Sequence, residues 1–311
     1  MFNSTHTLVG IVLARAGPDR WVPRAAVTAA IAANLPDVDI VSGFDGTATY
    51  LQCHRGITHS IAGISVLAFV FAAVMYFFSG NFWKTYLVAL LAMATHPLLD
   101  LANTYGLRPF LPWDGRWRYG DVLPIIDPYL DGLLLVGILA GAAFKGKKVV
   151  ATWLSLGLVL LYLGGRLELR HLATSQLLTL AARMPEVEKW GLAPHFLNPL
   201  VWDGMIQTPK QMLKISINPL DKMIAEINRM DRGRMSQVPK QALESRSASV
   251  LLGFARFPVI RTQGTDSELR VLIFDYRFYD DATNTALAAE IILDRSYRIT
   301  NESVSFQKML D

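Results

Sequence analysis

Cysteine is almost absent from this sequence, because Cys53 is the only one among 311 residues. A single thiol permits no disulfide within the chain, and it excludes a zinc site built from several thiolates. Charged residues are scarce too: they make up 18% of the chain, whereas hydrophobic residues make up 52%. This composition argues against an ordinary soluble enzyme. No basic segment precedes the first apolar stretch, so we expect no cleaved signal peptide.

The few charges lie mainly in the second half of the chain. Residues 1–165 contain 11 of the 30 Lys and Arg residues and 9 of the 26 Asp and Glu residues. Residues 60–79 carry no charge, and about 20 apolar residues suffice to cross a hydrocarbon core as a helix. Residues 85–103 and 149–165 are almost as apolar. Shorter apolar stretches cover residues 7–14, 25–36 and 132–144.

We therefore predict a mainly α protein with two domains. Residues 1–165 form a multi-pass helical membrane domain, and residues 166–311 form a small extramembrane α+β domain. In the second part, strand-like patterns occur in RVLIFDYRFYD and AEIILDRSYRI. His171 and His195 stand outside any ligand-like group, so we expect them to be surface or packing residues.

The distribution of cations between short loops predicts the orientation. The loops on one side of an alternating six-segment arrangement contain seven Lys and Arg residues, whereas the opposite loops contain four. Because cytoplasmic loops are enriched in Lys and Arg, the side with seven is predicted to be cytoplasmic. Both termini and the C-terminal domain would then lie on the periplasmic or other extracytoplasmic side. The net charge of +4 is spread over loops and the C-terminal part, so no nucleic-acid partner is expected.

Eight ionisable side chains that are far apart in the sequence map to that same outer side. They are His6, Asp37, Asp39, His54, His59, His96, Asp100 and Asp127. An Asp at the centre of a membrane helix costs about 2.5–3.5 kcal/mol, so such groups tend to face one another or a cavity. A shared metal ion would satisfy them together, although histidines paired with carboxylates inside a helical bundle would produce part of the same pattern.

Three short motifs supply most of these side chains. In THPLLD, His96 and Asp100 are four residues apart, which places both on one face of a helix. NLPDVDI supplies Asp37 and Asp39 where a helix gives way to a loop, and HRGITHS supplies two more histidines. Acidic residues at such a helix end are also common as solvated caps, so each motif alone leaves both interpretations open.

These motifs, together with HTLVG, NTYG and PWDGRWRYGDVLPIID, resemble those of the YdjM-like membrane-bound metal-dependent hydrolases. The resemblance covers about residues 1–165, and it implies a bacterial inner-membrane protein with hydrolase activity. A fainter similarity is to zinc-dependent phospholipase C. The residues that fit its ligand order are His6, Asp39 with His54, and His96 with Asp100. Other ligands of that family have no counterpart here, so one or two metal ions are expected rather than three.

Imidazole and carboxylate ligands without thiolates make zinc the first choice of metal, with manganese or iron as alternatives. The predicted metal ligands are His6, Asp39, His54, His59, His96 and Asp100. Asp37 or Asp127 is a candidate general base, or either could orient a histidine. Arg55 would bind a phosphate through its guanidinium fork, or it would instead pair with a carboxylate such as Asp37.

Arginines and aromatic residues are interleaved in WDGRWRYG, which contains Arg116 and Arg118. Guanidinium groups suit phosphate and aromatic rings suit the lipid headgroup layer, although such residues also anchor proteins that bind no substrate. We therefore predict hydrolysis of a phosphoester, phospholipid or other lipid-like substrate at the outer face of the inner membrane, with membrane lipid as the partner. The alternatives are a metal-stabilised scaffold or partner-binding protein, or a transporter, whose site would lie nearer the bilayer midplane.

Overall fold

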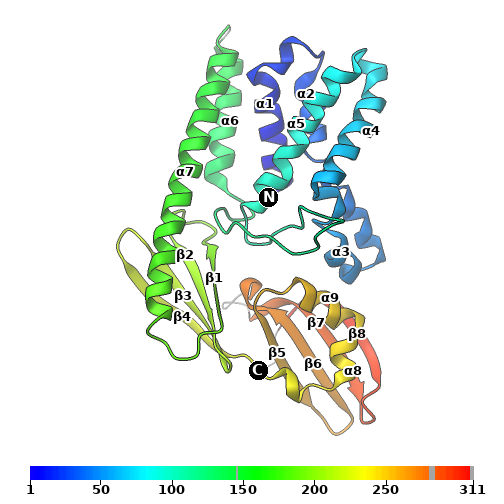
Figure 1. Ribbon diagram of the computed structural model, residues 1–311, viewed down its shortest axis with the longest axis vertical. Coiled ribbons are helices and arrows are strands. Elements are labelled where there is room, and N and C mark those ends of the chain that lie inside the picture. Colours follow the sequence, from blue (N-terminus) through cyan, green and yellow to red (C-terminus); the bar gives the residue numbers. More distant parts are fainter. Residues whose placement is uncertain (145, 280–283, 309–311) are drawn as a thin grey trace. The chain divides into compact units, whose positions relative to one another are not determined.

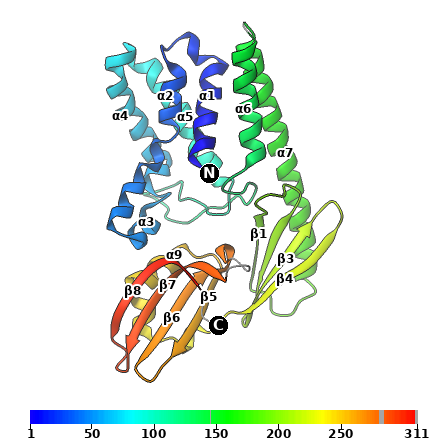
Figure 2. The same ribbon diagram turned by 180° about the vertical axis from the view of Figure 1, so that it is seen from behind.

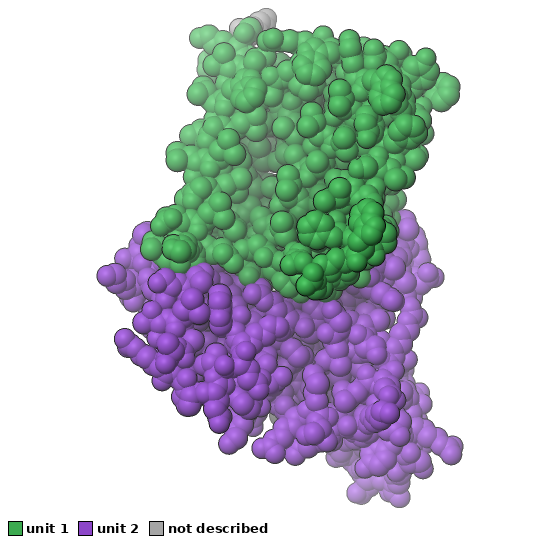
Figure 3. All heavy atoms as spheres, in the orientation of Figure 1, with its two compact units in different colours: residues 1–39, 55–172, 194–201 green, residues 40–54, 173–193, 202–311 purple. Residues whose placement is uncertain are grey.

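The computed structural model describes residues 1–144, 146–279 and 284–308 (Figure 1). The chain forms two compact units, which Figure 3 shows in different colours. The first unit comprises residues 1–39, 55–172 and 194–201, and the second comprises residues 40–54, 173–193 and 202–311. Residues 40–54 thus group with the C-terminal part of the chain, although they lie between two segments of the first unit. The predicted domain boundary after residue 165 stays a prediction.

The first unit is built from helices. They are α1 (Asn3–Ala16), α2 (Ala25–Ala32), α4 (Ile61–Ser79), α5 (Phe82–Leu101), α6 (Pro128–Ala143) and most of α7 (Lys148–Ala181), with the short 3-10 helices η1 (Pro18–Arg20) and η3 (Ile57–His59) and the first part of η2 (Leu35–Asp45). Side-chain caps fix where α4, α5 and α6 begin, because Ser60, Asn81 and Asp127 each accept a hydrogen bond of 3.0 Å from a backbone N–H of the first turn. These N–H groups have no partner within the helix itself.

Three helical segments of the described chain are long and apolar enough to cross a membrane. They are Ala25–Asp45, Ile61–Ser79 and Lys148–Ala181. These segments confirm a helical N-terminal region with apolar spans, while its multi-pass arrangement stays a prediction. The expected span 85–103 coincides with α5, which is not among the three segments, because Lys84, His96 and Asp100 lower its hydropathy.

Small side chains allow the helices of the first unit to approach one another closely. Ala29 of α2 and Ala89 and Ala92 of α5 are buried in one core cluster with residues of α4. Gly10 of α1 lies so near α2 that an added Cβ would be 2.6 Å from the Ala29 carbonyl oxygen. Small residues at helix interfaces are typical of membrane domains. This packing holds α1, α2, α4 and α5 together as one support for polar side chains at their ends.

Two four-stranded sheets dominate the second unit, and Figure 2 shows them from behind. The first sheet has the order β1 (Lys189–Pro194), β2 (Trp202–Gln207), β3 (Gln211–Asn218), β4 (Met223–Asp231), and the second has the order β5 (Pro258–Gly264), β6 (Glu268–Asp275), β7 (Thr285–Asp294), β8 (Ile299–Lys308). The pairs from β2 to β4 and from β5 to β8 are antiparallel. A β-sheet C-terminal region is therefore confirmed, and β6 and β7 overlap the two segments with strand-like patterns.

Short helices complete the second unit. They are α3 (Thr47–Cys53), η4 (Met235–Gln237), α8 (Lys240–Glu244), α9 (Arg246–Phe254) and η5 (Tyr276–Phe278). α3 packs against α9 and β8, and Arg246 donates a hydrogen bond of 2.7 Å to Thr49 Oγ1. These contacts explain why residues 40–54 group with the sheets, a long-range association that the local sequence pattern did not indicate.

Candidate metal centre

Six polar side chains from four segments of the first unit meet at one place. α1 contributes His6, η2 contributes Asp37 and Asp39, η3 contributes His59, and α5 contributes His96 and Asp100. As predicted from their spacing, the two α5 residues share one face of the helix. Five of the six residues are buried, and Asp37 is the partly accessible one, with 16% of its side chain exposed.

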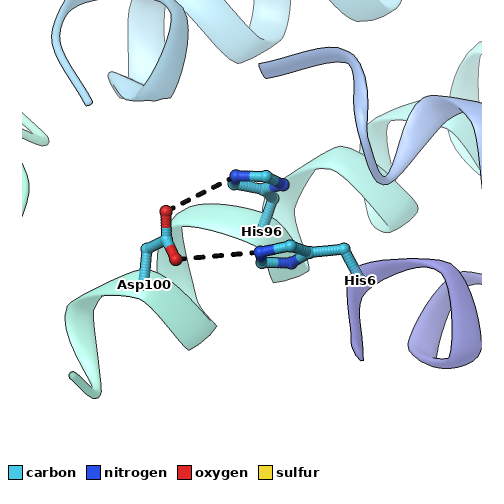
Figure 4. Close-up of side chains that lie close together, drawn as sticks. All are labelled: His6, His96 and Asp100. Carbon is cyan, nitrogen blue, oxygen red and sulfur yellow. Dashed lines mark ion pairs between the residues drawn. The ribbon is translucent and has the colours of Figure 1, made fainter. Parts of the chain in front are cut away.

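His6 and His96 stack on each other and share one partner, the Asp100 carboxylate. Their rings are stacked with centroids 3.6 Å apart, and Figure 4 shows each ring facing a different oxygen of Asp100. The distances are 3.7 Å from His6 Nε2 to Oδ1 and 3.4 Å from His96 Nε2 to Oδ2. Neither ring nitrogen of the fully buried His6 has a hydrogen-bond partner among the described residues. A buried unsatisfied group costs about 1–3 kcal/mol, so His6 lacks a partner that a bound cation would supply.

Four ligand-type atoms form a compact group beside this stack: Asp37 Oδ1, His59 Nε2, His96 Nε2 and Asp100 Oδ2. His59 Nε2 lies 3.1 Å from His96 Nε2, 3.3 Å from Asp37 Oδ1 and 3.5 Å from Asp100 Oδ2. His96 Nε2 lies 3.4 Å from each of the two carboxylate oxygens. Five of the six distances within the group therefore fall between 3.1 and 3.5 Å.

These five distances match those between neighbouring ligands of a tetrahedral metal ion. Ligand atoms about 2.0–2.1 Å from a zinc ion in tetrahedral geometry are separated from one another by about 3.3–3.4 Å. Two imidazole nitrogens and two carboxylate oxygens are also a donor set that zinc accepts, and one that manganese and iron tolerate. We call these four residues, Asp37, His59, His96 and Asp100, the tetrad. The tetrad and His6 are residues that could hold a metal ion.

The other nitrogen of each tetrad histidine is engaged by the protein. His96 Nδ1 lies 2.7 Å from the Ala33 carbonyl oxygen. His59 Nδ1 lies 3.0 Å from Thr58 Oγ1 and 3.3 Å from Asp39 Oδ2. Contacts of this kind hold a metal-binding imidazole in the tautomer that leaves its Nε2 free to bind. Asp39, predicted as a direct ligand, thus contacts the far side of the His59 ring, and its role as a ligand stays a prediction.

Arg55 is buried against the tetrad rather than exposed beside it. Its NH2 lies 3.0 Å from Asp100 Oδ1, and its NH1 donates a hydrogen bond of 2.9 Å to Asn103 Oδ1. The guanidinium carbon lies 4.5 Å from the centre of the Tyr105 ring, and the α-amino group of Met1 also contacts Asp100 Oδ1. Of the two roles considered for Arg55, these contacts favour pairing with a carboxylate, although the partner is Asp100 instead of Asp37.

Gly63 of α4 fixes how closely η3, which carries His59, approaches that helix. A Cβ at residue 63 would lie 1.8 Å from the Ile57 carbonyl oxygen. We expect Gly63→Ala to displace η3 and to lower zinc affinity by about tenfold or more, the effect of disturbing a ligand's support. Titration of the purified variant with zinc measures this change. Gly157→Ala is the matched control, because a Cβ at Gly157 of α7 meets nothing within 4 Å; equal affinities in both variants would contradict the expectation.

Asp127 and His54, two further predicted site residues, have other contacts within their own units. Asp127 caps α6, where its Oδ1 accepts hydrogen bonds from Tyr129 and Leu130 and its Oδ2 accepts one of 2.8 Å from Tyr162. His54 belongs to the second unit, where its ring stacks on Tyr50 with centroids 4.6 Å apart. A catalytic role for Asp127 and a ligand role for His54 stay predictions.

Arg116 and Arg118 share one acidic partner in the loop that precedes α6. Asp114 Oδ2 lies 2.8 Å from Arg116 NH2 and 3.1 Å from Arg118 NH2. Hydrogen bonds from Arg116 hold the pKa of Asp114 well below its usual value, and Asp114 in turn raises the pKa of Arg116. At neutral pH this loop therefore carries two guanidinium cations and one carboxylate, and the resulting net positive charge suits an anionic ligand.

Two residues at the site were not singled out from the sequence. Asn103 accepts hydrogen bonds from Arg55 and from the Tyr105 backbone N–H, and Thr58 donates one of 2.9 Å to Asp39. Asn103 begins the NTYG motif and Thr58 lies within HRGITHS. Their membership of these motifs was a usable signal, but spacing along the chain does not show which side chain a polar residue contacts.

Comparison with known proteins shows which family the first part of the chain is similar to. The profile of a family described as "YdjM inner membrane protein" matches residues 1–172. A similar curated protein is the "Uncharacterized protein YfhP" of Bacillus subtilis (strain 168), which is 29% identical over 172 residues, or 51% of this chain and 51% of that protein. The chain thus spans about half the length of this relative. No solved structure matches the chain. The fainter similarity to zinc-dependent phospholipase C is not among these findings and stays a prediction.

Proposed function

Because this chain belongs to the family of YdjM inner membrane proteins, we propose that it is a metal-dependent hydrolase of the bacterial inner membrane. The tetrad would hold the metal, with His6 as a further ligand. The substrate class that we favour is a phosphoester, phospholipid or other lipid-like molecule. The five distances of 3.1–3.5 Å between tetrad atoms are the observation that carries the proposal.

The accessibility of one tetrad residue favours an enzyme over a structural metal site. A closed structural zinc site needs four protein ligands, whereas a catalytic site keeps a position open for water. Asp37 is the partly accessible member of the tetrad, so it would leave its position to a water molecule while His59, His96 and Asp100 hold the ion. The buried His6, with neither ring nitrogen hydrogen-bonded, would serve a second ion or an ion with more than four ligands.

The residues around the tetrad have distinct tasks in this proposal. A bound zinc ion would supply Lewis acidity and would lower the pKa of a water molecule to about 7. Asp37 is the tetrad member with the most accessible side chain. We therefore assign it the role of general base, which accepts a proton from the attacking water. Arg55 holds Asp100 in place, and Asp39 and the Ala33 carbonyl hold the two imidazoles.

The test is metal analysis of the purified full-length protein combined with a hydrolysis assay. We expect one or two zinc ions per chain, and hydrolysis of bis-p-nitrophenyl phosphate or of phosphatidylglycerol vesicles that a chelator abolishes and zinc restores. Bound metal without any turnover would replace the proposal with the scaffold alternative. Protein that binds no zinc, manganese or iron would overturn both.

We further propose that the tetrad and the C-terminal part of the chain lie on the extracytoplasmic side of a multi-pass membrane domain. The excess of Lys and Arg in the loops of the opposite side supports this orientation. A topology reporter fused after Lys147 is expected to be active in the cytoplasm, and one fused after Asp311 is expected to be active outside it. A cytoplasmic signal from the second fusion would reverse the orientation.

A further inference from the structure

An apolar pocket of about 590 Å³ in the first unit reaches the tetrad. Nine of its eleven lining residues are apolar, and the other two are His59 and Arg118. Its walls come from the start of α4, the second half of α5 and the loop that follows α5, so all of them belong to the first unit. The volume is within the range of about 300–1,000 Å³ that is typical of small-molecule sites.

His59 connects the pocket to the chemistry of the site. It lines the pocket, and its Nε2 is one of the four tetrad atoms, 3.3–3.5 Å from the Asp37 and Asp100 carboxylates. A molecule that fills the pocket therefore reaches the ring that would bind the metal. Two other pockets of the first unit have no tetrad residue in their walls.

Arg118 gives the pocket a single cationic group. Its Nε is buried without a hydrogen-bond partner among the described residues, while its NH2 pairs with Asp114 at 3.1 Å. The guanidinium carbon lies 5.9 Å from the centre of the Phe110 ring, which also lines the pocket. One arginine among apolar walls complements a molecule with an apolar chain and an anionic group.

The pocket is placed where a membrane lipid can enter it. Ile61, which lines it, is the first residue of the candidate span Ile61–Ser79. Ile61 and Leu98 of the pocket wall are 56% and 65% exposed. Large apolar side chains exposed at the end of a membrane-spanning helix are in contact with lipid.

We propose that this pocket binds one acyl chain of an anionic phospholipid, with the phosphate between Arg118 and the tetrad. This inference rests on the proposed function and specifies its substrate class. The long apolar wall accommodates the chain, Arg118 selects the charged headgroup, and His59 places the phosphoester beside the metal ligands. Phospholipids without net charge would bind less well.

Photolabelling of the full chain tests the proposal without requiring turnover. The protein is reconstituted in phosphatidylcholine vesicles that contain a small fraction of phosphatidylglycerol with a photoreactive acyl chain. We expect crosslinks to residues of the pocket wall, and Ala94→Phe, which fills the pocket, is expected to reduce them about tenfold. Arg118→Gln is expected to remove the preference for phosphatidylglycerol over photoreactive phosphatidylcholine.

A second apolar pocket, between α6 and α7, supplies matched controls. Its volume is about 270 Å³, and its wall includes Ala140 and Lys147. Ala140→Phe and Lys147→Gln should leave the labelling of the first pocket and its headgroup preference intact. The proposal would be overturned if Ala94→Phe and Ala140→Phe reduced crosslinking equally. It would also be overturned if zinc-loaded protein gave no crosslinks in the first pocket. Labelling as expected in a protein that hydrolyses nothing would overturn the proposed function alone.

Discussion

Replacing His96 with alanine is expected to lower the zinc affinity of the purified protein by at least about 100-fold, because loss of a direct ligand exceeds the 10–100-fold effect of losing a ligand's support. His96 Nε2 lies within 3.4 Å of His59 Nε2 and of one oxygen each of Asp37 and Asp100, so its removal deletes one corner of the tetrad. Hydrolysis should fall in parallel. Zinc titration and metal analysis of folded protein measure the loss.

His171→Ala is the control for this prediction. His171 is an exposed residue of α7 in the same unit, so its replacement changes the histidine count without touching the tetrad. The variant should keep the zinc content and activity of the unaltered protein. Comparable zinc loss in both variants, or zinc retained in both, would exclude the tetrad as the metal site.

The Arg55→Ala variant is expected to be strongly destabilised when it is free of metal. Arg55 is 4% exposed, and its guanidinium pairs with the buried Asp100 at 3.0 Å. Removal of one partner of a buried ion pair costs about 3–5 kcal/mol, and the α-amino group of Met1 would be the remaining partner of Asp100 Oδ1. Zinc would compensate the Asp100 carboxylate from its other side, so added zinc should recover much of the lost stability. Thermal unfolding in detergent, with chelator and with zinc, measures both effects.

Arg116→Ala provides the comparison, because it removes an arginine whose side chain is 77% exposed and paired with Asp114. An exposed pair contributes about 0–1 kcal/mol, so the midpoint should barely change, and zinc should have the same effect as in the unaltered protein. Arg55→Ala protein that is as stable as Arg116→Ala without metal would contradict a structural role. It would restore the alternative in which Arg55 binds substrate phosphate.

Predictions about the site residues were confirmed where they depended on neighbours along the chain, and they could not be made where they depended on contacts between distant segments. His96 and Asp100 were predicted to share a face, and they do, because four residues span slightly more than one helical turn. Asp39 was assigned from its motif and from the fainter phospholipase C similarity, and Arg55 from the affinity of its guanidinium for phosphate. The structure shows Asp39 behind the His59 ring and Arg55 paired with Asp100, because both lie at a meeting point of η2, η3 and α5 whose geometry no local pattern contains.

Asp127 is another residue whose long-range contact the sequence did not indicate. Its position next to an apolar stretch was compatible with a general base, but Pro128 after it is also typical of a helix start. The structure shows the carboxylate capping α6 and accepting a hydrogen bond from Tyr162 of α7. The N-cap pattern was visible in the sequence, whereas the contact with α7 depends on how two helices pack.

The sequence by itself determined the family, the presence of long apolar helices, the strand-rich C-terminal part and the histidine and aspartate motifs. Composition, hydrophobic periodicity and short motifs indicate these features, and each of them is visible in continuous stretches of the sequence. Only the tertiary structure decided which atoms come within 3.1–3.5 Å of one another, that α3 packs with the C-terminal sheets, and that an apolar pocket adjoins His59. The physical reason is that these distances are set by close packing between helices far apart in the chain, where small residues such as Gly10 and Gly63 allow backbones to approach.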